Sequence, residues 1–287
     1  MKRPTELTRE IRDVVSAALE EDLGTGDVTS QALIPPDARG RASIVQKQPG
    51  VLFGAEAARE ALLQAGAEDF DTLVVEGQWR EEVPAVVARA SGPARALLAG
   101  ERVALNLLGL LSGVATITAR FVAEVEGSGA RILDTRKTIP GLRSLQKAAV
   151  AAGGGHNHRF GLHDAILIKE NHIAIAGGVA EAINRAKEAR PGMKVEVECE
   201  DTDQVRAAVR AGAEALLLDN MAPDELRSAV EAARELDGDR RVRLEASGGM
   251  TLENVAEIAA TGVDEISIGA LTHSAPALDV GLDLEPA

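Results

Sequence analysis

Residues 153–172, GGGHNHRFGLHDAILIKENH, concentrate imidazole and cationic side chains around one short apolar run, 165–168. The run is too short and too β-branched for a helix and is typical of a buried parallel strand. Lys169 and Glu170 follow at its carboxyl end, and because charges are costly inside a core, we expect them to face a pocket. The other members of this polar set are His156, His158, Arg159, His163 and His172. Glycines 153–155 allow a tight turn or close approach to a ligand.

Polar residues recur at the carboxyl ends of further strand-like runs. A single polar residue at a strand end is commonly an exposed surface residue or a helix cap. Polar residues at six successive strand ends favour a shared site, because the active sites of barrels lie at the carboxyl ends of the strands. Glu196, Glu198 and Glu200 alternate along one run and therefore share a face. The full series is Asp134, Arg136 and Lys137; Lys169 and Glu170; Glu196, Glu198 and Glu200; Asp219 and Asn220; Glu245, Ser247, Gly248 and Gly249; and Gly269 with His273.

The mixture of charges indicates the ligand. Arg136, Lys137, Arg159 and Lys169 would form a positive patch in an acidic protein, which suits a small polyanion with carboxylates or phosphates. Glu198 and Asp219 offer hard oxygen ligands to Mg²⁺, which binds through one or two carboxylates together with phosphates. Residues 247–249, Ser-Gly-Gly, precede a predicted helix whose free amides could bind phosphate.

Six strand-like runs alternate with helix-like runs from residue 130 onward: 131–134, 165–168, 194–199, 215–218, 243–246 and 265–268. Alternating strands and helices predict a parallel sheet with right-handed crossovers. We therefore expect an α/β fold with an incomplete (β/α) barrel of about six strands over residues 112–287. An open, doubly wound sheet is the rival arrangement.

The first third lacks this rhythm, so residues 1–111 are expected to form a separate α+β sandwich domain, to which the last twelve or so residues of the chain could return. The predicted helices are 6–21, 55–65 and 94–111, and the predicted strands are 41–48, 73–79 and 83–90. The helix 94–111 is apolar on nearly all sides, which is typical of a buried interface helix. An unpaired Arg102 there would be expensive, so we expect it to meet an anion.

Composition excludes several classes of function. A formal net charge of −14 argues against nucleic acid or anionic membrane as a partner, and 2% aromatic residues argue against base stacking. The single cysteine, Cys199, excludes an intrachain disulfide and a multi-cysteine zinc site. No signal peptide opens the chain and no uninterrupted apolar run reaches about 18 residues, so we expect a soluble cytoplasmic protein.

Several long motifs carry a family resemblance. The chain resembles quinolinate phosphoribosyltransferase, the carboxylating nicotinate-nucleotide pyrophosphorylase family, from about residue 18 to the carboxyl end. The motifs are EDLGTGDVTS, GERVALNLLGLLSGVAT, DTRKTIPGLR, the stretch 153–172, VEVECE, LLLDN, LEASGG and ISIGALTHS. Ile139 departs from the threonine expected in the third motif. The resemblance implies an α/β sandwich, an incomplete barrel and a homodimer that transfers phosphoribose from phosphoribosyl pyrophosphate (PRPP) to quinolinate with Mg²⁺ and decarboxylation.

The resemblance also implies roles for individual residues. Arg102, Arg136, His158 and Arg159 should hold the quinolinate carboxylates, with Arg102 reaching the partner's site across the dimer. Lys137 and Lys169 should face both the quinolinate carboxylates and the PRPP phosphates. Glu198 and Asp219 should bind the ribose hydroxyls and should hold the metal, either directly or through PRPP. These four residues are the expected catalytic residues. Ser247, Gly248, Gly249 and Gly269 should receive the 5′-phosphate, with His273 nearby.

Three alternatives stay open at this stage. One is a paralogous phosphoribosyltransferase of the kind found in molybdenum-transport operons, against which the complete arginine set argues. Another is a Schiff-base barrel aldolase that uses Lys169 as nucleophile. The last is a non-catalytic sensor of a phosphorylated metabolite, which would not need the carboxylates of Glu198 and Asp219.

Overall fold

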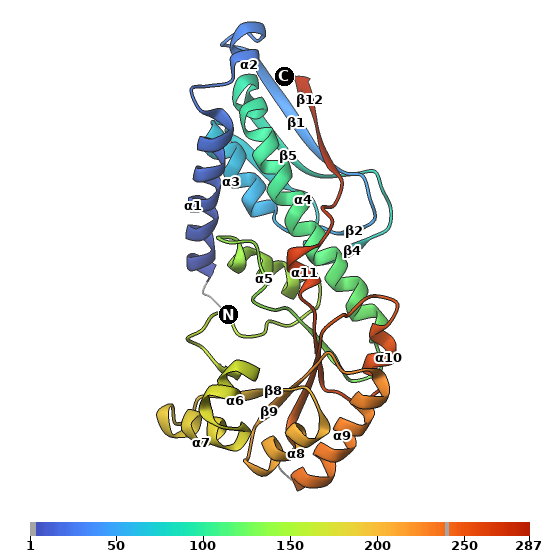
Figure 1. Cartoon of the computed structure of the whole chain (residues 1–287). Coiled ribbons are helices and arrows are strands. Elements are labelled where there is room, and N and C mark those ends of the chain that lie inside the picture. The colour runs from blue at the N-terminus through green and yellow to red at the C-terminus, as the bar shows by residue number, and fades with distance from the viewer. Residues whose placement is uncertain (1–3, 239–240) are drawn as a thin grey trace. The chain divides into compact units, whose positions relative to one another are not determined.

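The computed structural model describes residues 4–238 and 241–287, whose contacts form two compact units (Figure 1). The first unit comprises Met1–Ala119, Thr138–Gly154 and Leu271–Ala287, and the second comprises Arg120–Lys137 and Gly155–Ala270. Both units are therefore discontinuous in sequence. The expected boundary between residues 111 and 112 falls inside one long helix, α4 (Ala94–Glu124).

The second unit is built on a six-stranded parallel sheet, as the sequence predicted. Its strands are β6 (Arg131–Leu133), β7 (Ile166–Ile168), β8 (Val195–Cys199), β9 (Ala215–Asp219), β10 (Arg243–Ser247) and β11 (Glu265–Ser267). Their order is β6-β11-β10-β9-β8-β7, and every neighbouring pair is parallel. The order advances one strand at a time and brings the first strand beside the last. A barrel has this cyclic order, whereas a doubly wound sheet reverses at a switch point.

Helices of the second unit follow the strands: α6 (Glu170–Ala176), α7 (Val179–Ala189), α8 (Thr202–Arg210), α9 (Pro223–Asp237) and α10 (Val255–Ala259). Helices α7, α8 and α9 lie side by side along the sheet (Figure 1). Along β8, Val195, Val197 and Cys199 share one face, are fully buried and are apolar, while Glu196 and Glu198 point to the other face. One face of the sheet thus forms the core and the other carries carboxylates.

The first unit holds an antiparallel sheet of order β12-β1-β5-β3. Its strands are β12 (Val280–Pro286), β1 (Arg39–Gln46), β5 (Ala85–Pro93) and β3 (Asp69–Thr72), and β2 (Gly50–Val51) pairs with β4 (Trp79–Arg80). The other helices are α1 (Pro4–Leu23), α2 (Val28–Leu33), α3 (Ala55–Ala65), α5 (Arg143–Ala152) and α11 (Ala270–His273). The last strand of the chain, β12, pairs with β1 from Val280 to Pro286.

The predicted strand 73–79 is wrong, because β3 ends at Thr72 and β4 covers only Trp79–Arg80. The Glu76 carboxylate accepts hydrogen bonds from the amides of Gly54 and Ala55, at 2.6 and 2.7 Å, at the start of α3. Gly77 follows with φ +81°, a left-handed conformation that ends an extended segment. The apolar residues that suggested a strand are exposed on this turn, Val75 at 67%.

Helix α4 continues past the predicted end at residue 111. Ser112 stays helical and its hydroxyl bonds the backbone of Phe53, while a Cβ on Gly113 would overlap the carbonyl oxygen of Pro276. Both residues therefore serve packing rather than helix termination. Among the described residues, α4 alone is long and apolar enough to cross a membrane, and 61% of its apolar stretch is buried inside the protein. It is a core helix.

Candidate active site

Three charged groups meet where strands β7, β8 and β9 end. Lys169, directly after β7, forms an ion pair with Glu198 of β8. Burial raises the pKa of Asp219, at the end of β9, and the negative charge of Glu198 raises it further, while Lys169 and Lys137 oppose the shift. The ends of these parallel strands thus gather Lys169, Glu198 and Asp219, as the strand-end pattern predicted, and Lys137, which follows β6, lies within electrostatic reach of Asp219.

The charges of Arg136 and Arg159 interact within the second unit. Burial lowers the pKa of Arg159, and the positive charge of Arg136 lowers it further, while Glu196 and Asp164 act in the opposite direction. Arg159 also donates from Nη1 to the carbonyl oxygen of Ala165 at 3.3 Å. Two neighbouring guanidinium groups can each bind a carboxylate, so this pair is suited to a dicarboxylate.

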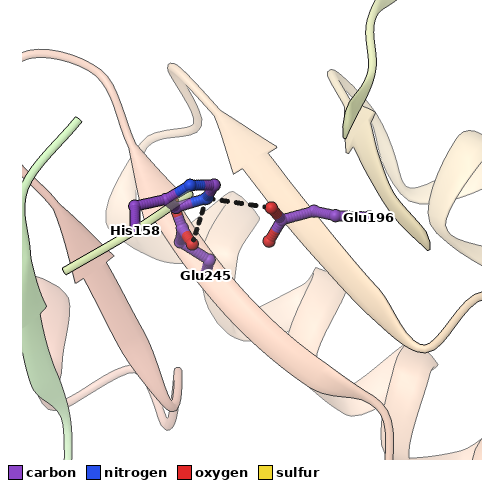
Figure 2. Close-up of side chains that lie close together, drawn as sticks. All are labelled: His158, Glu196 and Glu245. Atoms are coloured by element: carbon purple, nitrogen blue, oxygen red, sulfur yellow. Dashed lines mark hydrogen bonds and ion pairs between the residues drawn. The ribbon is translucent and has the colours of Figure 1, made fainter. Parts of the chain in front are cut away.

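His158, Glu196 and Glu245 form a cluster in which both glutamates are buried (Figure 2). Arg159 follows His158 in the chain. The two glutamates come from β8 and β10 and converge on Nε2 of the imidazole, with Oε2 of Glu196 at 2.9 Å and Oε2 of Glu245 at 3.4 Å. Burial alone would lower the pKa of His158, but the hydrogen bonds and charges of the glutamates outweigh it and raise the pKa to about 10. The cluster therefore retains its protons at neutral pH.

The other imidazole nitrogen decides what this cluster can bind. Nδ1 of His158 accepts a hydrogen bond from the backbone N–H of Arg159 at 2.7 Å, so the ring here carries its proton on Nε2, and the further proton that the cluster keeps at neutral pH lies on a carboxylate. A metal on Nε2 of a neutral imidazole would require the proton on Nδ1, against the Arg159 N–H. The His-Glu-Glu geometry therefore favours a proton over a metal. Burial raises the pKa of Glu245, and Glu196 raises it further, so Glu245 is the carboxylate suited to hold that proton.

The loop that carries His158 and Arg159 is fixed from both sides by aspartates. The fully buried Asp134, after β6, accepts the His158 N–H at 2.9 Å. Asp164 accepts the amide of Gly161 at 2.8 Å and that of Phe160 at 2.5 Å. In the sequence, Glu196 and Glu245 belong to the strand-end series, but the pattern assigns neither an individual role. Their strand-end and period-two positions were visible, but their pairing with His158 was not.

The 247–249 segment forms a glycine turn at the end of β10. Gly248 and Gly249 adopt φ of +97° and +61°, conformations that favour glycine. Ser247 pairs in register with Asp219 of β9, so the turn and this carboxylate leave the sheet at the same level. Gly269, after β11, belongs to the same unit. The predicted phosphate-binding residues of the second unit thus follow adjacent strands.

Two expected site residues, Arg102 and His273, belong to the first unit. The side chain of Arg102 is 62% exposed in this chain, with Glu101 Oε1 at 3.7 Å from Nη2. Asn106, one turn away, is exposed too, because residues four apart share a helix face. His273 is exposed, and its Nδ1 lies 2.5 Å from Oγ of Ser274.

Comparison with known proteins gives matches over both parts of the chain. Residues 27–112 match the N-terminal domain of the quinolinate phosphoribosyl transferase family, and residues 114–283 match its C-terminal domain. A probable nicotinate-nucleotide pyrophosphorylase [carboxylating] of Bacillus subtilis is 43% identical over 272 residues, covering 92% of this chain and 90% of the relative. The nicotinate-nucleotide pyrophosphorylase [carboxylating] of Mycobacterium leprae is 43% identical over 276 residues, covering 95% and 96%.

Solved structures share the whole architecture. The nicotinate-nucleotide pyrophosphorylase from Francisella tularensis superposes with a TM-score of 0.91 at 38% identity, covering 99% of this chain and 98% of that one. The similarity therefore extends over both compact units.

Proposed function

The chain belongs to the quinolinate phosphoribosyl transferase family, and we infer from this membership that it transfers phosphoribose from PRPP to quinolinate. The products are nicotinate mononucleotide, pyrophosphate and CO₂, a step of NAD synthesis. The structural observation that carries this conclusion is the pair Arg136 and Arg159, placed in the same unit as the cluster of Lys169, Glu198 and Asp219. One group suits a dicarboxylate, and the other suits a phosphorylated sugar.

The arginine pair, together with Lys137, His158 and Lys169, would bind and orient quinolinate. Two carboxylates on adjacent ring carbons match two guanidinium groups whose charges lie within electrostatic reach of each other. Holding the ring nitrogen beside the ribose C1 makes attack an intramolecular event, which is a large part of the catalytic gain. The nitrogen–C1 bond forms as the C1–pyrophosphate bond breaks, and the adjacent C2 carboxylate later leaves as CO₂ while a proton replaces it.

The carboxylates and the glycine turn would bind PRPP. Glu198 and Asp219 can accept hydrogen bonds from ribose hydroxyls, and the amides of residues 247–249, with Gly269 and His273, can receive the 5′-phosphate. Lys137 and Lys169 are ammonium groups suited to the pyrophosphate oxygens. Charge stabilisation of the departing pyrophosphate is the expected role of these lysines.

Magnesium is part of the proposal, and the residues fit it. Glu198 and Asp219 provide hard oxygen donors, and burial together with their mutual repulsion raises the pKa of Asp219, which a nearby cation would relieve. They would hold Mg²⁺ directly or through PRPP. When bound, the ion would neutralise phosphate charge.

The aldolase alternative is not favoured. A Schiff-base lysine needs a free amine, whereas Lys169 forms an ion pair with Glu198. The molybdenum-operon paralogue and the metabolite sensor are not favoured either, because relatives at 43% identity along most of the chain are named carboxylating pyrophosphorylases.

Assembly and location also belong to the proposal. We propose a cytoplasmic homodimer in which Arg102 of each subunit contacts the quinolinate of its partner. The exposed side chain of Arg102, with only Glu101 as an ion-pair partner in the contacts described above, leaves its guanidinium accessible for such a contact. Cell fractionation and mass measurement in solution would test the location and the dimer.

An activity assay tests the function itself. Purified protein with quinolinate, PRPP and Mg²⁺ should yield nicotinate mononucleotide and pyrophosphate, with CO₂ released in equal amount. Nicotinate is the matched control, because it lacks the second carboxylate that the arginine pair requires. Efficient use of nicotinate without turnover of quinolinate would refute the proposal.

A further inference from the structure

We propose that Asn220 is a positioning residue that fixes the Asp219 carboxylate relative to the phosphate-binding turn 247–249. The inference rests on the proposed function, which assigns the ribose to Asp219 and the 5′-phosphate to the turn. Asn220 follows β9 directly and lies in the second unit together with both groups. Three independent contacts of this residue carry the argument.

The carboxamide of Asn220 holds Asp219. Its Nδ2 donates a hydrogen bond to Oδ2 of Asp219 at 2.6 Å. Only the amide nitrogen can donate to a carboxylate, so this bond also fixes the direction of the carboxamide and turns Oδ1 away from Asp219. One carboxylate oxygen is thereby held by the protein, which leaves Oδ1 of Asp219 as the oxygen available for a sugar hydroxyl or a cation.

The backbone of Asn220 holds the turn. Its N–H donates to the carbonyl oxygen of Ser247 at 2.9 Å, one residue beyond the paired ends of β9 and β10. Asn220 does this with φ +56°, in the left-handed region that side chains rarely adopt and that asparagine tolerates better than most. A residue kept in this region requires surrounding structure that over-determines it, and such residues gather at functional sites.

The side chain of Asn220 also packs directly against the turn. A Cβ added to Gly248 would lie 2.6 Å from Cγ and 3.0 Å from the backbone nitrogen of Asn220, and would overlap its Oδ1. Gly248 thus has two reasons to be glycine, its φ of +97° and the carboxamide that occupies the space of a side chain. The carboxamide fills the gap between the ribose carboxylate and the phosphate turn, so neither can shift without the other.

This coupling matters because PRPP must be held at two ends at once. Its 5′-phosphate and its ribose hydroxyls are joined by a short covalent link, so the distance between the turn and Asp219 must match the substrate. Small misplacements of such groups reduce rate strongly. Quinolinate, assigned to Arg136 and Arg159, does not depend on this distance.

Two substitutions separate the carboxamide from the backbone. Asn220→Gly keeps the left-handed backbone and removes the carboxamide. Asn220→Asp keeps the shape but replaces the donor with a second carboxylate beside Asp219. We expect each to raise the KM for PRPP by about tenfold, the loss typical of one hydrogen bond in a site, with a change below about twofold in the KM for quinolinate. The dissociation constant of ribose 5-phosphate, measured by calorimetry, should rise in parallel.

Arg241→Gly is the matched control. Arg241 is the other non-glycine residue of the described chain with positive φ, at +51°, and it precedes β10 at the end opposite to the turn. Its replacement should leave both KM values and ribose 5-phosphate binding unchanged.

Unchanged ribose 5-phosphate affinity in both Asn220 variants would overturn the proposal, as would an equal rise in both KM values. A wild-type protein that binds ribose 5-phosphate without turning over quinolinate would instead refute the proposed function, and the binding comparison would still decide the role of Asn220. Wild-type protein that fails to bind ribose 5-phosphate overturns both.

Discussion

The backbone N–H of Arg159 donates to Nδ1 of His158 at 2.7 Å, so one hydrogen bond sets both the tautomer of the histidine and the path of the arginine's main chain. Nε2 of the same ring faces Glu196 and Glu245. The imidazole is thus held between two buried carboxylates and the residue that we assign to quinolinate. The protonation of this cluster should therefore be visible in the stability of the protein.

We predict that the free energy of unfolding falls between pH 7 and pH 10 because of this cluster. In the folded protein the cluster of His158 with the two glutamates holds its extra proton up to a pKa of about 10, above the ordinary histidine value of about 6.5. The stabilising contribution is therefore complete below about pH 6.5 and is lost as the pH rises through about 10. In Glu245→Gln one of the two carboxylates is gone, so the loss over this range should be smaller by on the order of 1–2 kcal/mol.

Urea unfolding at several pH values measures this difference. Glu257→Gln is the control, because Glu257 is an exposed glutamate on α10 whose carboxylate lies 3.8 Å from Arg227. Its stability should follow that of the wild type at every pH. Identical pH dependence in wild type and Glu245→Gln would show that the cluster does not retain the extra proton.

The carboxylates Glu198 and Asp219 give a second prediction. Glu198→Gln and Asp219→Asn keep the side-chain size and should preserve folding, since neither residue belongs to the apolar core. Turnover should fall roughly 10²-fold, as for loss of one preorganised electrostatic group, and more Mg²⁺ should be needed for half-maximal rate. Steady-state rates across a Mg²⁺ titration test this. Wild-type rates and Mg²⁺ dependence in both variants would reduce the two residues to structural roles.

The sequence predicted the second unit well because its signals are local. Each strand there is a short apolar run, helices such as α8 and α9 bury one apolar face, and polar residues stand at the strand ends. The sheet and the gathering of Lys169, Glu198 and Asp219 therefore followed from periodicity. The predicted strand 73–79 failed for a non-local reason. Glu76 caps α3, and that contact draws the segment out of an extended conformation.

Side-chain pairings between distant strands could not be predicted in the same way. Glu196 and Glu245 alternate with apolar residues on separate strands, and only the fold shows that both meet His158. The apolar composition of α4 could not show that Arg102 lies on an exposed face of this chain, because composition averages over a helix. The helical repeat places Arg102 and Asn106 together on an exposed face, while the three residues between them, 103–105, are buried.

Lys169 gives a third prediction, which separates charge from nucleophilicity. If its role is a fixed positive charge beside Glu198, Lys169→Arg should retain more activity than Lys169→Met, although the planar guanidinium is an imperfect replacement for an ammonium. Rates of nicotinate mononucleotide formation measure this. Lys194→Met is the control and should have an activity near that of the wild type. Lys194 precedes β8 at its amino end, whereas Glu198 lies near the carboxyl end of the same strand. Covalent trapping of Lys169 by borohydride in the presence of a carbonyl substrate would support the aldolase chemistry instead.

The last prediction concerns Arg102 and the proposed dimer. Arg102→Ala and Lys169→Ala should each be nearly inactive as homodimers, because every site lacks one of its cationic groups. If Arg102 acts on the partner's site, a mixed dimer collects both defects in one site and leaves the other intact. Random exchange makes about half of the dimers mixed, each with one good site, so activity should recover to roughly a quarter of wild type.

Subunit exchange is verified by native mass measurement with one variant isotope-labelled, and Asn106→Ala mixed with wild type controls for a general effect of mixing. Complete exchange with activity that stays at the parental level would show that Arg102 does not act across the interface.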